Sequence, residues 1–148
     1  MNVMSTPRFS VIIPLYNKEA EIERTLRSVL AQTLQPLEIV IVDDGSTDRS
    51  CERVEAIASP LIKLHRQANA GSAVARNRAI ELSEGEYIAM IDADDEWTPD
   101  YLAEMARLID LYPDCGGWCA GFDIVSADGV FAGDTPQYEG VLYGEDYF

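Results

Sequence analysis

The chain has 148 residues, of which 47% are hydrophobic, so it can form one domain with a sizeable core and is too apolar to be disordered throughout. Its net charge of −15 repels nucleic-acid phosphates, which argues against a broad DNA- or RNA-binding surface. No apolar run approaches the roughly 20 residues of a membrane span, and the first nine residues lack a signal-peptide pattern. We therefore expect a cytoplasmic protein.

The negative charge is concentrated in the second part of the chain. Residues 1–83 carry ten basic and ten acidic side chains, whereas residues 84–148 carry only Arg107 against sixteen acids. A solvated acidic face is the ordinary interpretation. A carboxylate-rich rim that recruits a divalent cation, or a basic continuation outside this chain, would also explain it.

The cysteine and histidine content argues against a stapled or zinc-bound scaffold. Cys51, Cys115 and Cys119 leave one thiol unpaired in any disulfide scheme, so reduced thiols are expected. Four soft zinc ligands are hard to assemble with His65 as the single histidine. His65 ends a short apolar run and is interpreted as a strand-end residue rather than a catalyst.

Apolar spacing along the first hundred residues alternates between strand-like and helix-like periods, which predicts an α/β fold. The predicted strands cover residues 9–15, 37–42, 61–64 and 87–91. Helices are expected between them, because the strand-helix-strand order requires crossovers and thus a mostly parallel sheet.

Capping and breaking residues set the expected helix limits. The first predicted helix covers residues 18–32 with Asn17 as its cap, and the second is capped by Ser46 or Thr47 and ended by Pro60. The third covers residues 70–82, and Thr98-Pro99 opens the fourth. After residue 113 the pattern changes to G-G-W-C-A-G-F-D-I-V and A-D-G-V-F, which predicts an antiparallel hairpin at the sheet edge. Residues 134–148 have no clear periodicity.

Polar side chains follow the first predicted strand in the sequence V-I-I-P-L-Y-N-K-E. Pro14 removes a ladder donor there, and Tyr16, Asn17 and Glu19 come at the strand's carboxyl edge. An aromatic ring beside amide and carboxylate groups suits a planar base with imide edges, such as uracil or guanine. An ordinary strand-to-helix turn is the simpler alternative.

The second strand runs into D-D-G-S-T-D. Asp43 or Asp44 could accept a hydrogen bond from a base N–H or a ribose hydroxyl, Gly45 permits a close turn, and Ser46 lies in the following loop. A good turn and helix start would use the same residues. The G-x-G-x-x-G and Walker patterns are absent, which argues against a dinucleotide or P-loop site.

The third and fourth segments add a cation and a carboxylate cluster. Arg76 lies in the helix after N-A-G-S, and an arginine fork matches a diphosphate. The fourth strand ends in D-A-D-D, where Asp92, Ala93 and Asp94 lead the acidic run. Magnesium or manganese is typically held by one or two carboxylates together with substrate phosphates. The sequence therefore predicts a Mg²⁺ or Mn²⁺ site at this strand end.

In order and spacing, these four motifs resemble the nucleotide-binding half of family 2 inverting glycosyltransferases of the GT-A fold, from Phe9 to about Tyr101. The resemblance implies a Rossmann-like α/β/α sandwich with a late antiparallel edge. It implies that the nucleoside is held by Pro14, Tyr16, Glu19 and Asp43. It further implies that Asp94 is the metal ligand, that Asp92 is its neighbour at the ribose, diphosphate or metal, and that Arg76 lies near the nucleotide.

The resemblance also implies a donor, an acceptor and a catalytic base. A UDP-sugar is the favoured donor, and a carbohydrate or lipid-linked molecule is the expected acceptor. We expect a single domain over residues 1–148, with the nucleotide-binding part at about 9–101 and the start of the acceptor part at about 114–148. The base is expected beyond Phe148, because Asp146 stands too close to Asp92 in the sequence, so a truncated enzyme is expected. Membrane attachment through missing segments or partners stays open, as does the oligomeric state.

Two other functions fit parts of the pattern. A regulatory module could bind the nucleotide without transferring a sugar. A nucleotidyltransferase would need a glycine-rich, basic loop after the first strand, and residues 16–19 read Y-N-K-E instead.

Overall fold

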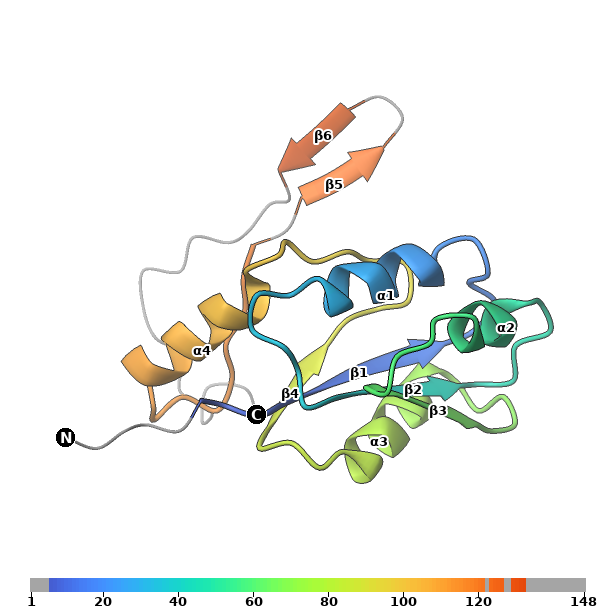
Figure 1. Cartoon of the computed structure of the whole chain (residues 1–148), viewed down its shortest axis with the longest axis horizontal. Helices are drawn as coiled ribbons and strands as arrows, with labels where there is room; N and C mark the ends of the chain where they lie inside the picture. The colour runs from blue at the N-terminus through green and yellow to red at the C-terminus, as the bar shows by residue number, and fades with distance from the viewer. Residues whose placement is uncertain (1–5, 122, 127–128, 133–148) are drawn as a thin grey trace. The chain divides into compact units, whose positions relative to one another are not determined.

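The computed structural model describes residues 6–121, 123–126 and 129–132, and the chain divides into two compact units, residues 1–103 and 104–148. The first unit contains a four-stranded sheet in the order β3-β2-β1-β4 (Figure 1). The strands are β1 (Phe9–Leu15), β2 (Glu38–Asp43), β3 (Ile62–Arg66) and β4 (Tyr87–Met90). All three pairings are parallel, as the strand-helix alternation predicts.

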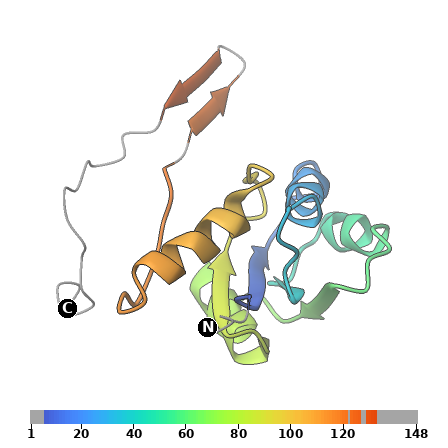
Figure 2. The same cartoon turned by 60° about the vertical axis from the view of Figure 1, so that its left-hand side comes forward.

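Helices cover both faces of this sheet, with α1 (Ile22–Leu30) and α2 (Ser50–Glu55) on one side and α3 (Ser72–Leu82) on the other (Figures 1 and 2). Because strand side chains alternate, Ile12, Val40 and Val42 share one face, where they pack with Ala75 and Ala79 of α3. Every residue of β2 is buried. This burial on both faces is typical of a parallel α/β sheet and confirms the predicted fold class.

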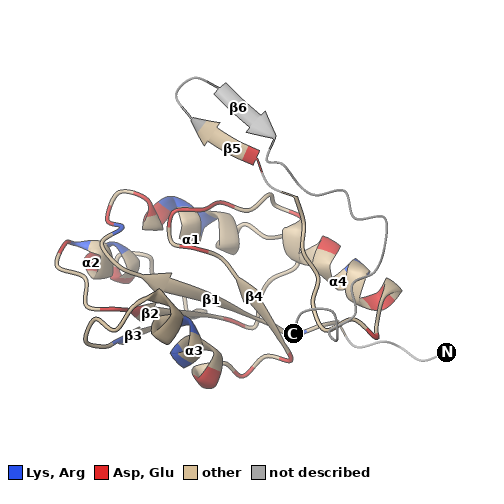
Figure 3. Cartoon of the chain, turned by 180° about the vertical axis from the view of Figure 1, so that it is seen from behind, with Lys and Arg blue, Asp and Glu red and all other residues tan. Residues whose placement is uncertain are grey.

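The second unit contains most of α4 (Tyr101–Leu111) and the hairpin of β5 (Asp123–Ser126) and β6 (Gly129–Ala132). The antiparallel pairing is confirmed, but the two strands form a sheet of their own instead of an edge of the parallel sheet. Acidic residues, coloured red, lie on α4 and at the start of β5 (Figure 3). Within the described residues, no helix has the length and apolarity needed to cross a bilayer. Residues 134–148, including Asp146, lie outside the described part.

Three helix starts differ from the predictions. α1 begins at Ile22 without a side-chain cap, because residues 18–21 form a turn and Asn17 bonds elsewhere. α2 begins at Ser50, so neither Ser46 nor Thr47 caps it. α4 begins at Tyr101 rather than at Thr98-Pro99, whose carbonyl oxygens accept hydrogen bonds from Gln32 and Thr33.

The amino-terminal edge of the sheet is closed by a buried polar network around Glu38, which is 2% exposed. Its Oε1 accepts hydrogen bonds from Ser10 Oγ and the Glu84 amide, both at 2.6 Å, and its Oε2 lies 2.6 Å from Lys63 Nζ. Burial alone raises the pKa of Glu38, but these hydrogen bonds outweigh burial, and the pKa lies below its ordinary value. The network fixes the edge opposite the acidic strand ends.

Gly85 closes this network in a space that admits no side chain. Its amide donates to Ser10 Oγ, and an added Cβ would lie 2.6 Å from the Ser10 nitrogen and 2.8 Å from the Arg8 carbonyl oxygen. Because these are backbone atoms, the strand itself would have to move.

We predict that Gly85→Ala lowers the free energy of unfolding by about 1–3 kcal/mol through this overpacking. Urea denaturation measures the change. Gly116→Ala is the matched control, since no described atom lies within 4 Å of its added Cβ, and it should change stability by less than about 0.5 kcal/mol. Equal stability of the two variants would show that the edge relaxes freely.

Candidate functional site

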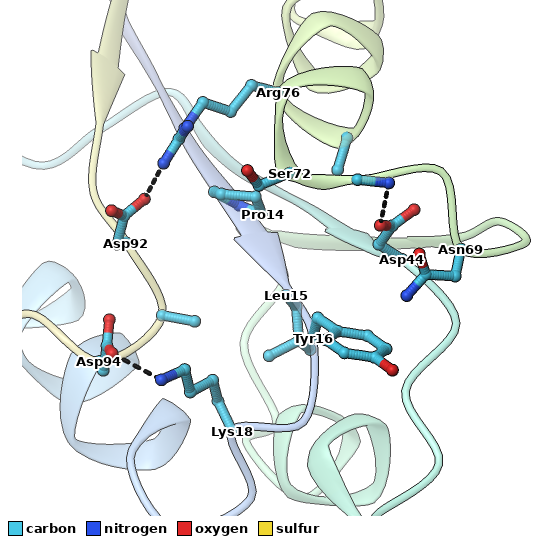
Figure 4. Close-up of a pocket in the computed structure, with 13 residues that line it drawn as sticks. Pro14, Leu15, Tyr16, Lys18, Asp44, Asn69, Ser72, Arg76, Asp92 and Asp94 are labelled. Atoms are coloured by element: carbon cyan, nitrogen blue, oxygen red, sulfur yellow. Dashed lines mark hydrogen bonds and ion pairs between the residues drawn. The ribbon is translucent and has the colours of Figure 1, made fainter.

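A pocket of about 460 Å³ lies at the carboxyl edge of the parallel sheet (Figure 4). Four chain segments line it, namely the ends of β1, β2 and β4 and the start of α3. The register explains this convergence, because β1 and β2 end together at the Leu15–Asp43 pair. β4 runs parallel to β1 and ends at Met90, which pairs with Ile12, so all three strands leave the sheet toward the same edge. Asp44, Asp92 and Asp94 from two strand ends therefore line one pocket, whereas Asp43 does not line it.

Seven of the predicted site residues line this pocket, namely Pro14, Tyr16, Asp44, Arg76, Asp92, Ala93 and Asp94. They divide into two groups in Figure 4. Tyr16 and Asp44 lie on one side together with Asn69, whereas Arg76, Asp92 and Asp94 lie on the other. The pocket thus has an aromatic and amide end and a charged end.

Asn17 and Glu19 do not line the pocket but join the loop after β1 to the loop after β2. Asn17 has a positive φ of 50°, and its Oδ1 accepts from the Thr47 amide at 2.8 Å. Glu19 Oε2 accepts from the Arg49 amide at 2.9 Å, and the Glu19 amide donates to Asp48 Oδ2 at 3.1 Å. In this structure both residues hold the loops that carry the site.

Asp43 and Ser46 likewise bond to each other outside the pocket lining. Asp43 is 4% exposed, and its Oδ1 accepts from the Ser46 amide at 3.1 Å, while Ser46 Oγ accepts from the Asn17 amide at 3.0 Å. Burial raises the pKa of the neighbouring Cys51 thiol to about 11, and Asp43 adds to the rise. Asp43 therefore faces the α2 side of the sheet.

Asp44 faces the opposite side and organises the loop before α3. Its Oδ1 accepts from Gln67 Nε2 at 2.7 Å and from the Ala70 amide at 2.9 Å, and its Oδ2 accepts from the Gly71 amide at 2.8 Å. Burial alone raises the pKa of Asp44, but these three hydrogen bonds outweigh burial and lower it below the ordinary value. The carboxylate stays ionised and fixes the start of α3 against the end of β2.

Two ion pairs span the charged end of the pocket. Arg76 of α3 pairs with Asp92, and Lys18 Nζ lies 2.6 Å from Asp94 Oδ2. The Lys18 hydrogen bond lowers the pKa of Asp94 against the opposing effect of burial. Burial raises the pKa of Asp95, and the negative charges of Asp94 and Asp92 raise it further.

The backbone of the acidic loop is held from α1. Thr25 Oγ1 donates to the carbonyl oxygens of Ala93 at 3.0 Å and Asp95 at 2.7 Å, and Arg24 donates to the Asp94 carbonyl at 2.8 Å. The two carboxylates that enter the pocket therefore project from an anchored loop.

At the charged end, Asp92 and Asp94 are the residues that could contribute ligands to a hard divalent cation. Asp92 and Asp94 offer carboxylate oxygens as metal ligands, and they are already paired with Arg76 and Lys18 respectively. Within the described residues, no group of three or more carboxylate, histidine or cysteine side chains is arranged to hold a metal by itself. A metal here would need further oxygen ligands, and a bound diphosphate could supply them.

The sequence interpretation missed Lys18, Asn69 and Ser72 as lining residues. Lys18 stands within the Y-N-K-E motif, between the predicted site residues Asn17 and Glu19. Asn69 and Ser72 flank Gly71, whose φ of +96° is the left-handed conformation that favours glycine. The sequence N-A-G-S before a helix was the available signal, because such a turn aims side chains and amides at the preceding strand ends.

Comparison with known proteins decides the family. Residues 10–133 match the sequence profile described as Glycosyl transferase family 2. The chain belongs to glycosyltransferase family 2. Among family 2 relatives, it is 46% identical to the uncharacterized glycosyltransferase YibD of Escherichia coli (strain K12), over 78% of this chain and 36% of YibD. It is 36% identical to the putative teichuronic acid biosynthesis glycosyltransferase TuaG of Bacillus subtilis (strain 168), over 84% of this chain and 50% of TuaG.

Solved structures support the same family and its GT-A fold. The crystal structure of S. aureus TarS 1-349 in complex with UDP-GlcNAc matches with a TM-score of 0.67 and 36% identity, over 72% of this chain and 32% of that one. A complex of the same TarS portion with UDP matches with a TM-score of 0.66 and 34% identity, over 72% of this chain and 33% of that one. This chain therefore spans one third to one half of the length of these family 2 relatives.

We predict that Asp44→Asn lowers the free energy of unfolding at pH 7 by about 1–3 kcal/mol, because an amide cannot accept all three hydrogen bonds. The pKa of Asp44 is lowered in the folded state, so its contribution is complete above the ordinary pKa of about 4. It is lost as pH falls through the lowered folded value. The difference between the two proteins should therefore shrink below about pH 4 in urea denaturation.

The exposed Asp110, converted to Asn, is the control for the loss of one charge and should leave stability nearly unchanged. Equal stability of wild type and Asp44→Asn at pH 7 would contradict the assigned role of Asp44.

Proposed function

We propose that this chain binds a nucleotide-diphospho-sugar, with a UDP-sugar favoured, together with Mg²⁺ or Mn²⁺, for transfer of the sugar to an acceptor hydroxyl with inversion. The observation that carries the proposal is a single pocket shared by Tyr16, Asp44, Arg76 and Asp94 from four separate segments. The UDP and UDP-GlcNAc complexes of the TarS neighbours support the donor class.

The two ends of the pocket match the two ends of such a donor. Tyr16, which is 47% exposed, offers an aromatic face, and the nearby Asn69 amide offers both a donor and an acceptor. Asp44 retains lone pairs beyond its three hydrogen bonds, so it can also accept from a base N–H. We therefore place the nucleoside at this end and the diphosphate at the charged end.

Arg76 and the acidic loop would hold the leaving group. The Arg76 guanidinium can form paired hydrogen bonds to phosphate oxygens when it turns from Asp92. Asp94, with Asp92 beside it, would hold the divalent metal, which when bound supplies positive charge against the developing charge of the nucleoside diphosphate. We assign the catalytic base that deprotonates the acceptor to no described residue, and the candidate Asp146 lies outside the described part.

The acceptor class and the location of the activity rest on two further observations. The name of TuaG refers to teichuronic acid biosynthesis, which supports a carbohydrate or lipid-linked acceptor and a role in polysaccharide biosynthesis. All three cysteines are free, the state that a reducing cytoplasm maintains. We therefore place the activity in the cytoplasm.

We predict that Asp94→Asn weakens UDP binding in the presence of manganese by at least about tenfold, because the metal loses a carboxylate ligand. Isothermal titration calorimetry with UDP, with and without manganese, measures the effect. Parallel titrations with GDP and dTDP test the preference for uridine.

Asp100→Asn removes the same charge from an exposed position outside the pocket and should leave UDP affinity unchanged. Undiminished manganese-dependent affinity in Asp94→Asn would contradict the metal assignment. Failure of the wild-type chain to bind any of the three nucleotides would contradict the donor site as a whole.

A further inference from the structure

The ammonium of Lys18 contacts the same carboxylate that the proposed function assigns to the metal. Lys18 follows β1 and Asp94 follows β4, and their side chains meet at the charged end of the pocket (Figure 4). The 2.6 Å separation of Nζ and Oδ2 makes this a direct ion pair. This inference rests on the proposed function, since it concerns how the site receives its metal.

The backbone at both ends of the pair is fixed, whereas the side chains are not enclosed. The Lys18 amide donates to Ser50 Oγ at 2.7 Å, and its carbonyl accepts from the amides of residues 21 and 22. The Asp94 loop is held by Arg24 and Thr25. The Lys18 and Asp94 side chains are 36% and 44% exposed, so the ammonium can leave the carboxylate without any backbone movement.

Among the described residues, Lys18 is the cation that pairs directly with the Asp94 carboxylate. Asp92 is already paired with Arg76, and Arg24 contacts the Asp94 carbonyl rather than its carboxylate. A lysine ammonium is a compact point charge on a flexible stem, so it sits at a carboxylate oxygen as a small inorganic cation does. Lys18 and a divalent cation therefore compete for the same oxygen.

We propose that Lys18 is an internal cation that a divalent metal must displace from Asp94. Until displacement, the ammonium balances the charge of Asp94, so the pocket gains little from binding a metal alone. A donor brings phosphate oxygens that complete the metal's ligand set and negative charge that accepts the released ammonium. The site consequently takes up metal together with the donor rather than before it.

The test is manganese binding to the full chain without nucleotide, measured from the electron paramagnetic resonance signal of free Mn²⁺. Lys18→Met keeps the length of the stem but removes the charge. It should raise manganese affinity about five- to twentyfold, as expected from removing a competing ion pair and a nearby positive charge. Lys18→Arg, which can still pair with Asp94, should stay close to wild type.

Arg53→Met is the matched control, because Arg53 is an exposed cation on α2 outside the pocket lining. An effect of Lys18→Met no larger than that of Arg53→Met would overturn the proposal, as would weaker manganese binding. Equal gains in Lys18→Met and Lys18→Arg would also overturn it, since the charge would then not be the cause.

UDP titrations of the same samples separate this inference from the proposed function. If the wild type binds UDP and Lys18→Met has the same manganese affinity as the wild type, the displacement of Lys18 by the metal is overturned, while the proposed donor site is retained. Absence of UDP binding in every sample contradicts the proposed function instead. If Lys18→Met binds no manganese with or without UDP, the displacement of Lys18 by the metal is overturned as well.

Discussion

Parallel pairing of β1 with β2 on one side and β4 on the other is the constraint on which the site depends. Parallel strands leave the sheet at the same edge, so the chain must turn there three times within a short distance. Each of those turns carries polar side chains, and the pocket forms between them and the start of α3. The buried network around Glu38 and Ser10 fixes the opposite edge, which leaves the carboxyl edge as the place where the polar loops converge.

The loops at that edge are held by hydrogen bonds between segments far apart in the sequence. Asn17 and Glu19 connect the first loop to the second, Asp44 connects the second to the start of α3, and Thr25 holds the acidic loop from α1. Most of these bonds join a side chain to a backbone amide or carbonyl, so they fix loop positions without using the side chains of Tyr16, Arg76 and Asp94. Arg76 and Asp94 are instead held in ion pairs between partly exposed side chains, which a ligand can replace. The site is therefore shaped before any ligand arrives, which reduces the conformational entropy that binding must overcome.

The sequence predicted the sheet and the acidic edge because both depend on local patterns, such as the β-branched run ending in Asp43 and Asp44. It could not decide which of these neighbours faces the pocket. Because side chains alternate along a strand, Asp44 lies on the face of Val40 and Val42, which α3 covers, and Asp43 lies on the face of α2. The sequence pattern alone does not show which helix covers which face of the sheet. The helix starts and the Lys18–Asp94 pair were missed for a related reason, since they depend on partners 29 to 76 residues away.

Amide NMR spectra of the full chain titrated with UDP and Mg²⁺ test most directly whether separate strand ends form one nucleotide pocket. The amides of Tyr16, Asn69, Gly71 and Asp94 come from three of the converging segments. They should shift together with a single dissociation constant, while those of Glu84 and Gly85 at the opposite edge should not move. Shifts confined to one of these segments, or centred on residues 84 and 85, would contradict a shared pocket.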